Sequence, residues 1–164
     1  MKIQSKKKIT KAGWLLFYLY IILLSYFLFF SEHYGRENIL PEYRYNLEFF
    51  KEIRRFITYR EQLGFEVFIV NIVGNILAFA PFGFMLPLLN TKYRKFFLIA
   101  FLSLLFSLSV EVVQLLFKVG IFDVDDIMLN TVGGILGYLA YKVVHILYSL
   151  FTPNKKKKKK VKKR

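Results

Sequence analysis

Four long apolar runs, separated by short polar segments, dominate the pattern of hydrophobic and polar positions along this chain. They cover residues 12–30, 67–89, 96–117 and about 127–151. Each run is long enough to cross the hydrocarbon core of a bilayer, which takes about 20 residues. The first run lacks a small-residue cleavage site at its end, so we expect a retained anchor rather than a signal peptide. The pattern predicts an all-α polytopic membrane protein with four transmembrane helices.

Basic residues cluster in three of the segments that flank these runs. Five lysines precede the first run, three basic residues lie in the turn at 90–95, and nine follow position 154. Because Lys and Arg favour the cytoplasmic side of short loops, we predict that both termini are cytoplasmic. Segments 31–66 and 118–126 are then outside. The expected location is the bacterial plasma membrane, with multiple passes.

The interpretation of the net charge depends on where the basic residues lie along the chain. The chain is 55% hydrophobic and carries 25 Lys and Arg against 11 Asp and Glu. The two terminal segments hold the whole excess, so nucleic-acid binding is not expected. We predict a transmembrane domain over 1–151 and a polybasic cytoplasmic tail over 152–164 that contacts membrane lipids. The absence of cysteine excludes disulfides and thiolate metal sites.

The first outer segment, 31–66, has an apolar stripe at helical spacing. The stripe consists of Leu47, Phe50, Ile53 and Ile57, and charged residues occupy most of the other positions. This pattern predicts a short amphipathic helix. It could lie at the outer membrane interface or pack on the top of the bundle, and the pattern does not separate these two arrangements.

Polar residues lie at a similar depth, toward the predicted outer ends of three spans. At about 100° per residue they share one face in each span. They are Asn71 and Asn75, Glu111 and Gln114, and Asp126 and Asn130. Because polar groups within a membrane face a bundle interior or a water-filled cavity, we predict that these six side chains line one pocket open to the outside. Asp123, in the adjoining loop, is expected to bind ligand with them.

Some of these residues also have structural explanations. Amide side chains often join helices by hydrogen bonds, which we favour for Asn71 and Gln114 taken alone. Asp123 or Asp125 can cap the N-terminus of the last span. We favour function for Glu111 and Asp126, since a serine would meet most structural needs at lower cost.

Glycines and prolines in the spans predict how the helices pack. Gly133 and Gly137 form a GxxxG pair, which allows close approach of a neighbouring helix. Pro81 and Pro87 interrupt the run 67–89, where they should bend the helix.

Three sequence blocks resemble the VanZ-like family of bacterial membrane proteins. The blocks are NIVGNILAFAPFGFMLPLL, SVEVVQLLF and FDVDDIMLNTVGGILGY. The resemblance runs from about Asn46 to Tyr141. It implies a family signature at Asn75, Pro81, Gly83, Glu111, Gln114, Asp126, Asn130 and Gly133. One departure is Phe49, in NLEFF, where many members of the family have proline.

The family takes its name from a protein of glycopeptide-resistance gene clusters that is linked to reduced teicoplanin susceptibility. The resemblance thus implies a Gram-positive cell-envelope protein with a role in resistance as one option. We favour a binding protein whose outer pocket meets a glycopeptide, a lipoglycopeptide or a lipid-linked wall precursor.

Two other functions remain open from the sequence. One is a membrane enzyme acting on a lipid-linked substrate, with Glu111 as general base and Asp126 as a metal ligand or orienting group. The candidate metal ligands are Asp123, Asp125 and Asp126, which would suit a divalent cation; no other cofactor is indicated. A transporter would require homo-oligomers, because four spans form a narrow bundle.

Overall fold

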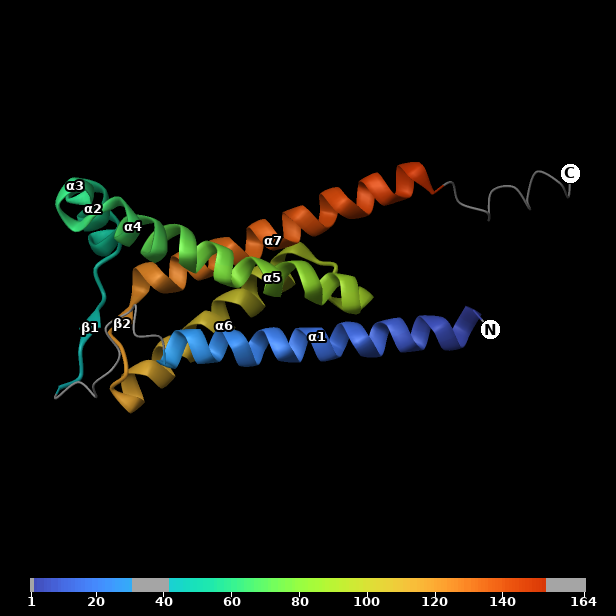
Figure 1. Ribbon diagram of the computed structural model, residues 1–164, viewed down its shortest axis with the longest axis horizontal. Helices are drawn as coiled ribbons and strands as arrows, with labels where there is room; N and C mark the ends of the chain where they lie inside the picture. The colour runs from blue at the N-terminus through green and yellow to red at the C-terminus, as the bar shows by residue number, and fades with distance from the viewer. Residues whose placement is uncertain (1, 31–41, 153–164) are drawn as a thin grey trace, which may run out of the picture.

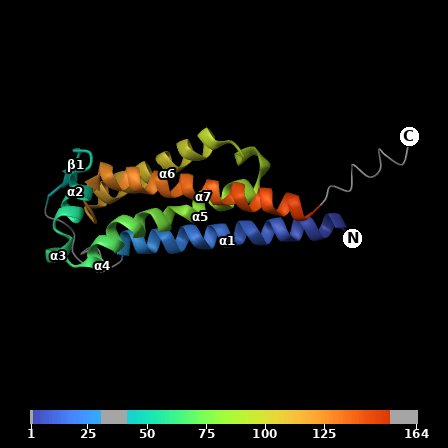
Figure 2. The same ribbon diagram turned by 90° about the horizontal axis from the view of Figure 1, so that it is seen from above.

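The long helical segments run lengthwise through one bundle (Figures 1 and 2). The computed structural model describes residues 2–30 and 42–152. The first span is α1 (Lys2–Phe30). The second consists of α4 (Phe65–Phe68), η2 (Ile69–Val73) and α5 (Gly74–Leu89) in succession. The third is α6 (Phe96–Phe117), and the fourth is α7 (Val124–Phe151). All four spans are long and apolar enough to cross a membrane. The predicted all-α fold with four transmembrane helices is therefore confirmed.

The closest packing in the bundle joins α5 to α7. A Cβ added at Gly133 would lie 2.2 Å from the backbone oxygen of Ile76, and one at Gly137 would lie 1.9 Å from that of Ala80. Neither position can hold a larger residue unless the helices move apart. The predicted role of the GxxxG pair is confirmed, and Gly83 of α5 meets Gly134 of α7 in the same way.

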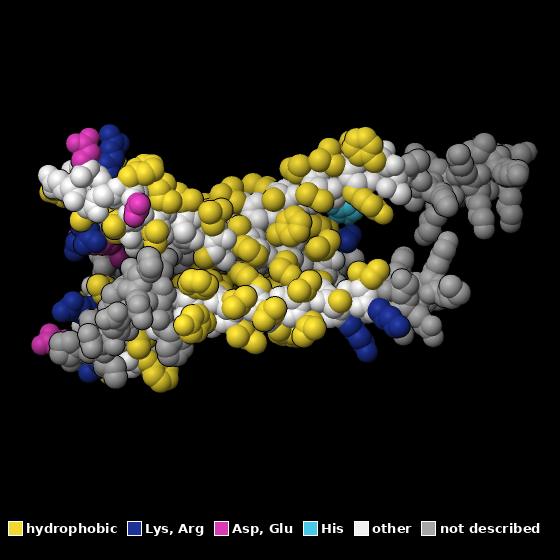
Figure 3. Space-filling model, viewed as in Figure 1, with side chains coloured by type: hydrophobic (Ala, Val, Ile, Leu, Met, Phe, Trp, Pro, Cys, Tyr) yellow, Lys and Arg dark blue, Asp and Glu magenta, His cyan; other side chains and the backbone are white. Residues whose placement is uncertain are grey.

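Apolar side chains fill the bundle and also cover its outside. One buried cluster is formed by Phe17, Phe82, Leu86, Ile99, Tyr138 and Tyr141. Figure 3 shows apolar side chains over the length of the bundle surface, whereas the acidic side chains in this view lie at the end near α2 and α3. An apolar lateral surface is what helices in contact with lipid require.

The connection between the first two spans covers one end of the bundle (Figure 1). It contains β1 (Tyr45–Asn46), α2 (Lys51–Thr58) and α3 (Arg60–Leu63). Strand β1 pairs in parallel with β2 (Phe122–Asp123), just before α7. A 3₁₀ turn, η3 (Thr91–Tyr93), joins α5 to α6 at the opposite end, where α1 begins and α7 ends.

The predicted amphipathic helix is present, but it begins after the first two residues of the predicted apolar stripe. Leu47 and Phe50 precede α2, and Phe56 is the residue that α2 buries. The N-terminus of α2 is bound by a side chain of α7, so this helix packs on the bundle. Residues 31–41 and the predicted tail beyond Thr152 lie outside the described residues.

Candidate functional site

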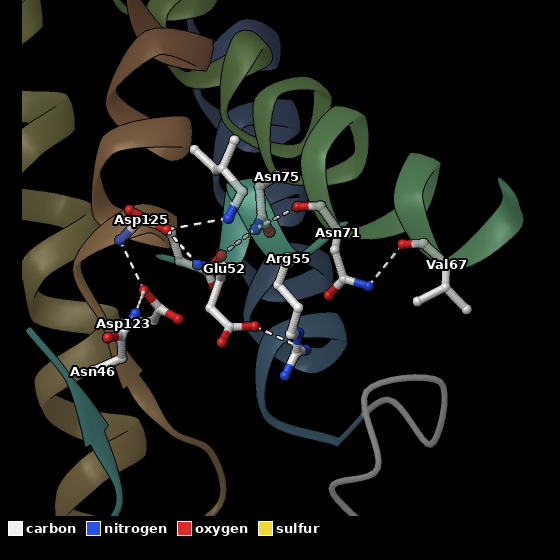
Figure 4. Close-up of polar contacts among 10 residues, drawn as sticks. Asn46, Glu52, Arg55, Val67, Asn71, Asn75, Asp123 and Asp125 are labelled. Atoms are coloured by element: carbon white, nitrogen blue, oxygen red, sulfur yellow. Dashed lines mark hydrogen bonds and ion pairs between the residues drawn. The ribbon is translucent and has the colours of Figure 1, made fainter. Parts of the chain in front are cut away.

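Asp125 caps helix α2, although it belongs to the first turn of α7. The side chain is fully buried. Its carboxylate accepts hydrogen bonds from the backbone N–H groups of Phe50 at 2.5 Å, Glu52 at 2.9 Å and Ile53 at 3.2 Å. Figure 4 shows Asp125 beside Glu52. The first N–H groups of a helix have no partner within it, and the residue before α2 offers no side-chain cap. Asp125 supplies the missing acceptor.

Asp123 caps α7 itself, as predicted. Its carboxylate accepts the N–H of Asp125 at 2.8 Å and the side-chain amide of Asn46 at 3.1 Å. Burial raises the pKa of the Asp123 carboxyl above its ordinary value, although these two hydrogen bonds oppose the shift. Asn46 was not predicted to take part. Only the pairing of β1 with β2, which aligns Asn46 with Asp123, places it here.

Glu111 is buried between helices, with 2% of its surface exposed. Its carboxylate accepts the backbone N–H of Asp123 at 3.0 Å. The side chain therefore positions the segment that begins α7, and it does not open to the outside as predicted.

Gln114 and Asn130 make hydrogen bonds between helices. The amide of Gln114 donates to the backbone oxygen of Leu28 in α1 at 2.9 Å. The amide of Asn130 donates to the hydroxyl of Ser107 in α6 at 3.0 Å. Both residues are 1% exposed. The interhelical role favoured for Gln114 is confirmed, and Asn130 has one too.

Asp126, Asn75 and Asn71 form a row from α7 to the second span. The amide of Asn75 donates to the Asp126 carboxylate at 2.7 Å and to the backbone oxygen of Asn71 at 2.9 Å. The Asn71 amide donates to Val67 of its own helix at 2.8 Å, rather than to another helix (Figure 4). Asp126 and Asn71 are half-buried, so the row reaches from the interior to the surface.

The row ends at a hollow of about 400 Å³. Asn71 and Glu66 are its polar lining residues, and its other walls are Phe65, Val67, Ile69 and Val70. Asn71 lies in the π-helix η2, a local distortion that is frequent at functional sites. Sequence reasoning missed Glu66 and the π-helix, because neither belongs to a recognisable motif.

The six predicted pocket residues thus do not line one open pocket. Asn75, Glu111, Gln114 and Asn130 are at most 4% exposed, because backbone and side-chain groups of neighbouring helices fill the space around them. Asp126 and Asn71 remain near the surface. Of these six residues, Asn71 lines the hollow described above.

The three aspartates do not converge on a common point that suits a metal ion. In residues 2–30 and 42–152 no group of three or more His, Cys, Asp or Glu side chains is arranged as a metal site. One carboxylate oxygen of Asp123 and both of Asp125 already accept N–H donors. A divalent cation stays a prediction.

Comparison with known proteins places the chain in a family. The model of the VanZ/LLP1 family matches residues 17–147. Protein VanZ of Enterococcus faecium is 37% identical over 76 residues, which are 43% of this chain and 44% of that protein. The matched part is thus less than half the length of this relative. No solved structure matches the chain. Because the family match covers most of its length, this membrane protein belongs to the VanZ/LLP1 family.

Proposed function

We propose that this protein is a multi-pass plasma-membrane protein that lowers teicoplanin susceptibility by binding an envelope ligand. The ligand would be the lipoglycopeptide or a lipid-linked wall precursor. The observation that carries the proposal is the row Asp126–Asn75–Asn71, which ends at a hollow with Glu66 on its wall. A hollow with apolar walls and a few polar groups suits a ligand that has both a lipid part and a polar part.

The proposed orientation puts this hollow at the outer face. The described Lys8 and Lys11 of α1, and the basic turn containing Arg94, lie at the opposite end of the bundle. Since basic residues favour the cytoplasmic side, the end with α2 and α3 is outside and both termini are inside.

Binding accounts for the geometry better than catalysis does. The Glu111 carboxylate accepts a backbone N–H and is almost fully buried, whereas a general base must reach its substrate. A divalent cation at the site would have Asp126 as its nearest candidate ligand from the predicted set. Self-association is a further prediction.

Teicoplanin susceptibility tests the proposal directly. Wild type, Asp126→Asn and the exposed control Glu61→Gln would be expressed in a susceptible Gram-positive host, with membrane levels checked by blot. Asn at 126 can still accept the Asn75 hydrogen bond, but it lacks the charge. We expect wild type and Glu61→Gln to raise the inhibitory concentration several-fold and Asp126→Asn to abolish the rise.

Two outcomes would contradict the proposed function. If wild type has no effect, teicoplanin is not the relevant ligand. If Asp126→Asn protects as well as wild type, the row near the hollow is structural.

A further inference from the structure

A second hollow lies at the opposite end of the bundle. Its volume is about 320 Å³, and it is bounded by α5, the turn after η3 and α7. Arg94, His145 and Tyr141 line it together with apolar walls that include Phe84 and Val144. None of these residues belongs to the outer site, so this hollow needs its own explanation.

Arg94 is held in a fixed position at the edge of this hollow. Its Nε donates to the backbone oxygen of Pro87 at 3.2 Å. One terminal nitrogen lies 3.4 Å from Nε2 of His145, which must accept because a guanidinium only donates. The hydroxyl of Tyr138 donates to the backbone oxygen of Arg94 at 3.0 Å. The guanidinium is one of the groups that line the hollow.

Within residues 2–30 and 42–152, no carboxylate pairs with this guanidinium. No ion pair joins Arg94 to an acid of the described residues. The sequence explains why: segments 2–30, 67–110 and 127–152, which build this end, contain no Asp or Glu. A fixed arginine without an acid is suited to an anion from outside the chain, and its planar fork matches phosphate geometry.

Tyr141 contributes a buried hydroxyl to the same hollow. The side chain is 3% exposed, and its buried hydroxyl has no hydrogen-bond partner in the described part of the chain. The guanidinium carbon of Arg94 lies 5.8 Å from the centre of its ring. Buried hydroxyls without partners are uncommon, and this one belongs to a side chain that interacts with the Arg94 guanidinium.

The position of the hollow indicates which anion it meets. Arg94 lies between the spans that end at Leu89 and begin at Phe96, so it lies at the level where lipid headgroups meet the hydrocarbon. We propose that this hollow binds an anionic phospholipid, with the phosphate on Arg94 and the acyl chains along the apolar walls. A soluble phosphate would leave the apolar walls uncovered, whereas a phospholipid can contact both Arg94 and the apolar walls.

Lipid titration followed by native mass spectrometry tests the proposal. The full chain, in detergent micelles, would be titrated with dioleoyl phosphatidylglycerol, with dioleoyl phosphatidylcholine and with glycerol 3-phosphate. Wild type should bind phosphatidylglycerol several-fold more tightly than phosphatidylcholine, and glycerol 3-phosphate weakly. Arg94→Gln should weaken phosphatidylglycerol binding by about tenfold, which is the usual effect of losing a hydrogen bond to a charged group.

Lys92→Gln is the matched control, because it removes an equal charge from the same turn at an exposed residue outside the hollow. It should change the affinity less than twofold. Basic segments elsewhere in the chain are the same in both variants, so any attraction they have for anionic lipid cancels in the comparison. A second variant, Val144→Phe, fills the hollow without changing charge, and it should also weaken binding of the lipid.

Three results would overturn the proposal. They are equal losses from Lys92→Gln and Arg94→Gln, unchanged binding by Val144→Phe, and glycerol 3-phosphate binding as tight as that of the lipid. If Arg94→Gln fails to fold, Val144→Phe decides the question. Because these residues lie at the opposite end of the bundle from the proposed outer site, lipid binding can fail while the teicoplanin effect persists, and the reverse.

Discussion

Three aspartates within four positions have three different environments. Asp123 caps its own helix, Asp125 caps a helix of the first connection, and Asp126 bonds to Asn75. The sequence predicted a cap on α7, since a cap depends on local spacing. It placed Asp126 and Asn75 in one open pocket and did not foresee the hydrogen bond that joins them. It could not predict the partner of Asp125, because that contact joins residues 72 to 75 positions apart.

Loss of the Asp125 charge should release the N-terminus of α2. In Asp125→Asn the amide offers one acceptor oxygen where three N–H groups need partners. We expect a loss of about 1–3 kcal/mol in the free energy of unfolding and faster hydrogen exchange at the amides of Glu52 and Ile53. The control is Glu48→Gln, whose side chain is 70% exposed. Unchanged exchange at these amides in Asp125→Asn would contradict the cap.

The raised pKa of Asp123 predicts a pH effect of known sign. Between the ordinary value of 3.8 and the higher folded value, the folded state binds more protons than the unfolded state. Stability therefore falls as pH rises through this window. The side chain of Asp123→Asn can still cap α7, but it has no carboxyl to titrate and so lacks this dependence of stability on pH. The unfolding temperature of wild type, relative to Asp123→Asn, should drop as pH rises from below 3.8. A constant difference over that range would show that Asp123 does not titrate this way.

At the scale of helices, the sequence predicted the long spans well and the local distortions poorly. Long apolar runs and the spacing of Gly133 and Gly137 are sufficient to predict four helices and one close contact. The π-helix around Asn71 matches no local sequence pattern that predicts such a distortion. The start of α2 after Phe50 depends on Asp125, so the apolar stripe alone placed it too early.

The glycine contact between α5 and α7 has a distinctive test. Gly→Ala within a helix usually stabilises by up to about 1 kcal/mol, but at Gly133 the new Cβ would meet the backbone of Ile76. We expect Gly133→Ala to destabilise by about 1–3 kcal/mol, measured by thermal unfolding in detergent. Gly13→Ala is the matched control, because its Cβ would meet only the flexible side chain of Leu89. Equal effects at both positions would disprove the close contact.

At the scale of the whole molecule, the bundle has two chemically different ends. One end carries α2, α3 and the acidic residues, and the other carries the basic turn with Arg94. The positions of the charged residues along the sequence predicted this division, because the spans separate the basic segments from the acidic ones. Which buried residues form contacts and which remain reachable could not be predicted, since that depends on how four helices pack.

Cysteine labelling tests the proposed orientation. The chain has no cysteine, so single cysteines can be introduced at Glu61 in α3 and at Lys92 in the turn between α5 and α6. In intact cells a membrane-impermeant maleimide should label Glu61→Cys, and should label Lys92→Cys only after the membrane is permeabilised. The opposite result would place the hollow beside Asn71 in the cytoplasm.

The bond between Asp125 and α2 also sets an order of events during synthesis. The backbone groups that Asp125 binds are made 72 to 75 residues before it. When α2 leaves the ribosome, its cap does not yet exist, and it appears only when α7 has been translated. Helix α2 therefore reaches its capped state only after synthesis of α7 has begun, and a chain truncated before Asp125 would retain its first three spans while α2 lacks its anchor.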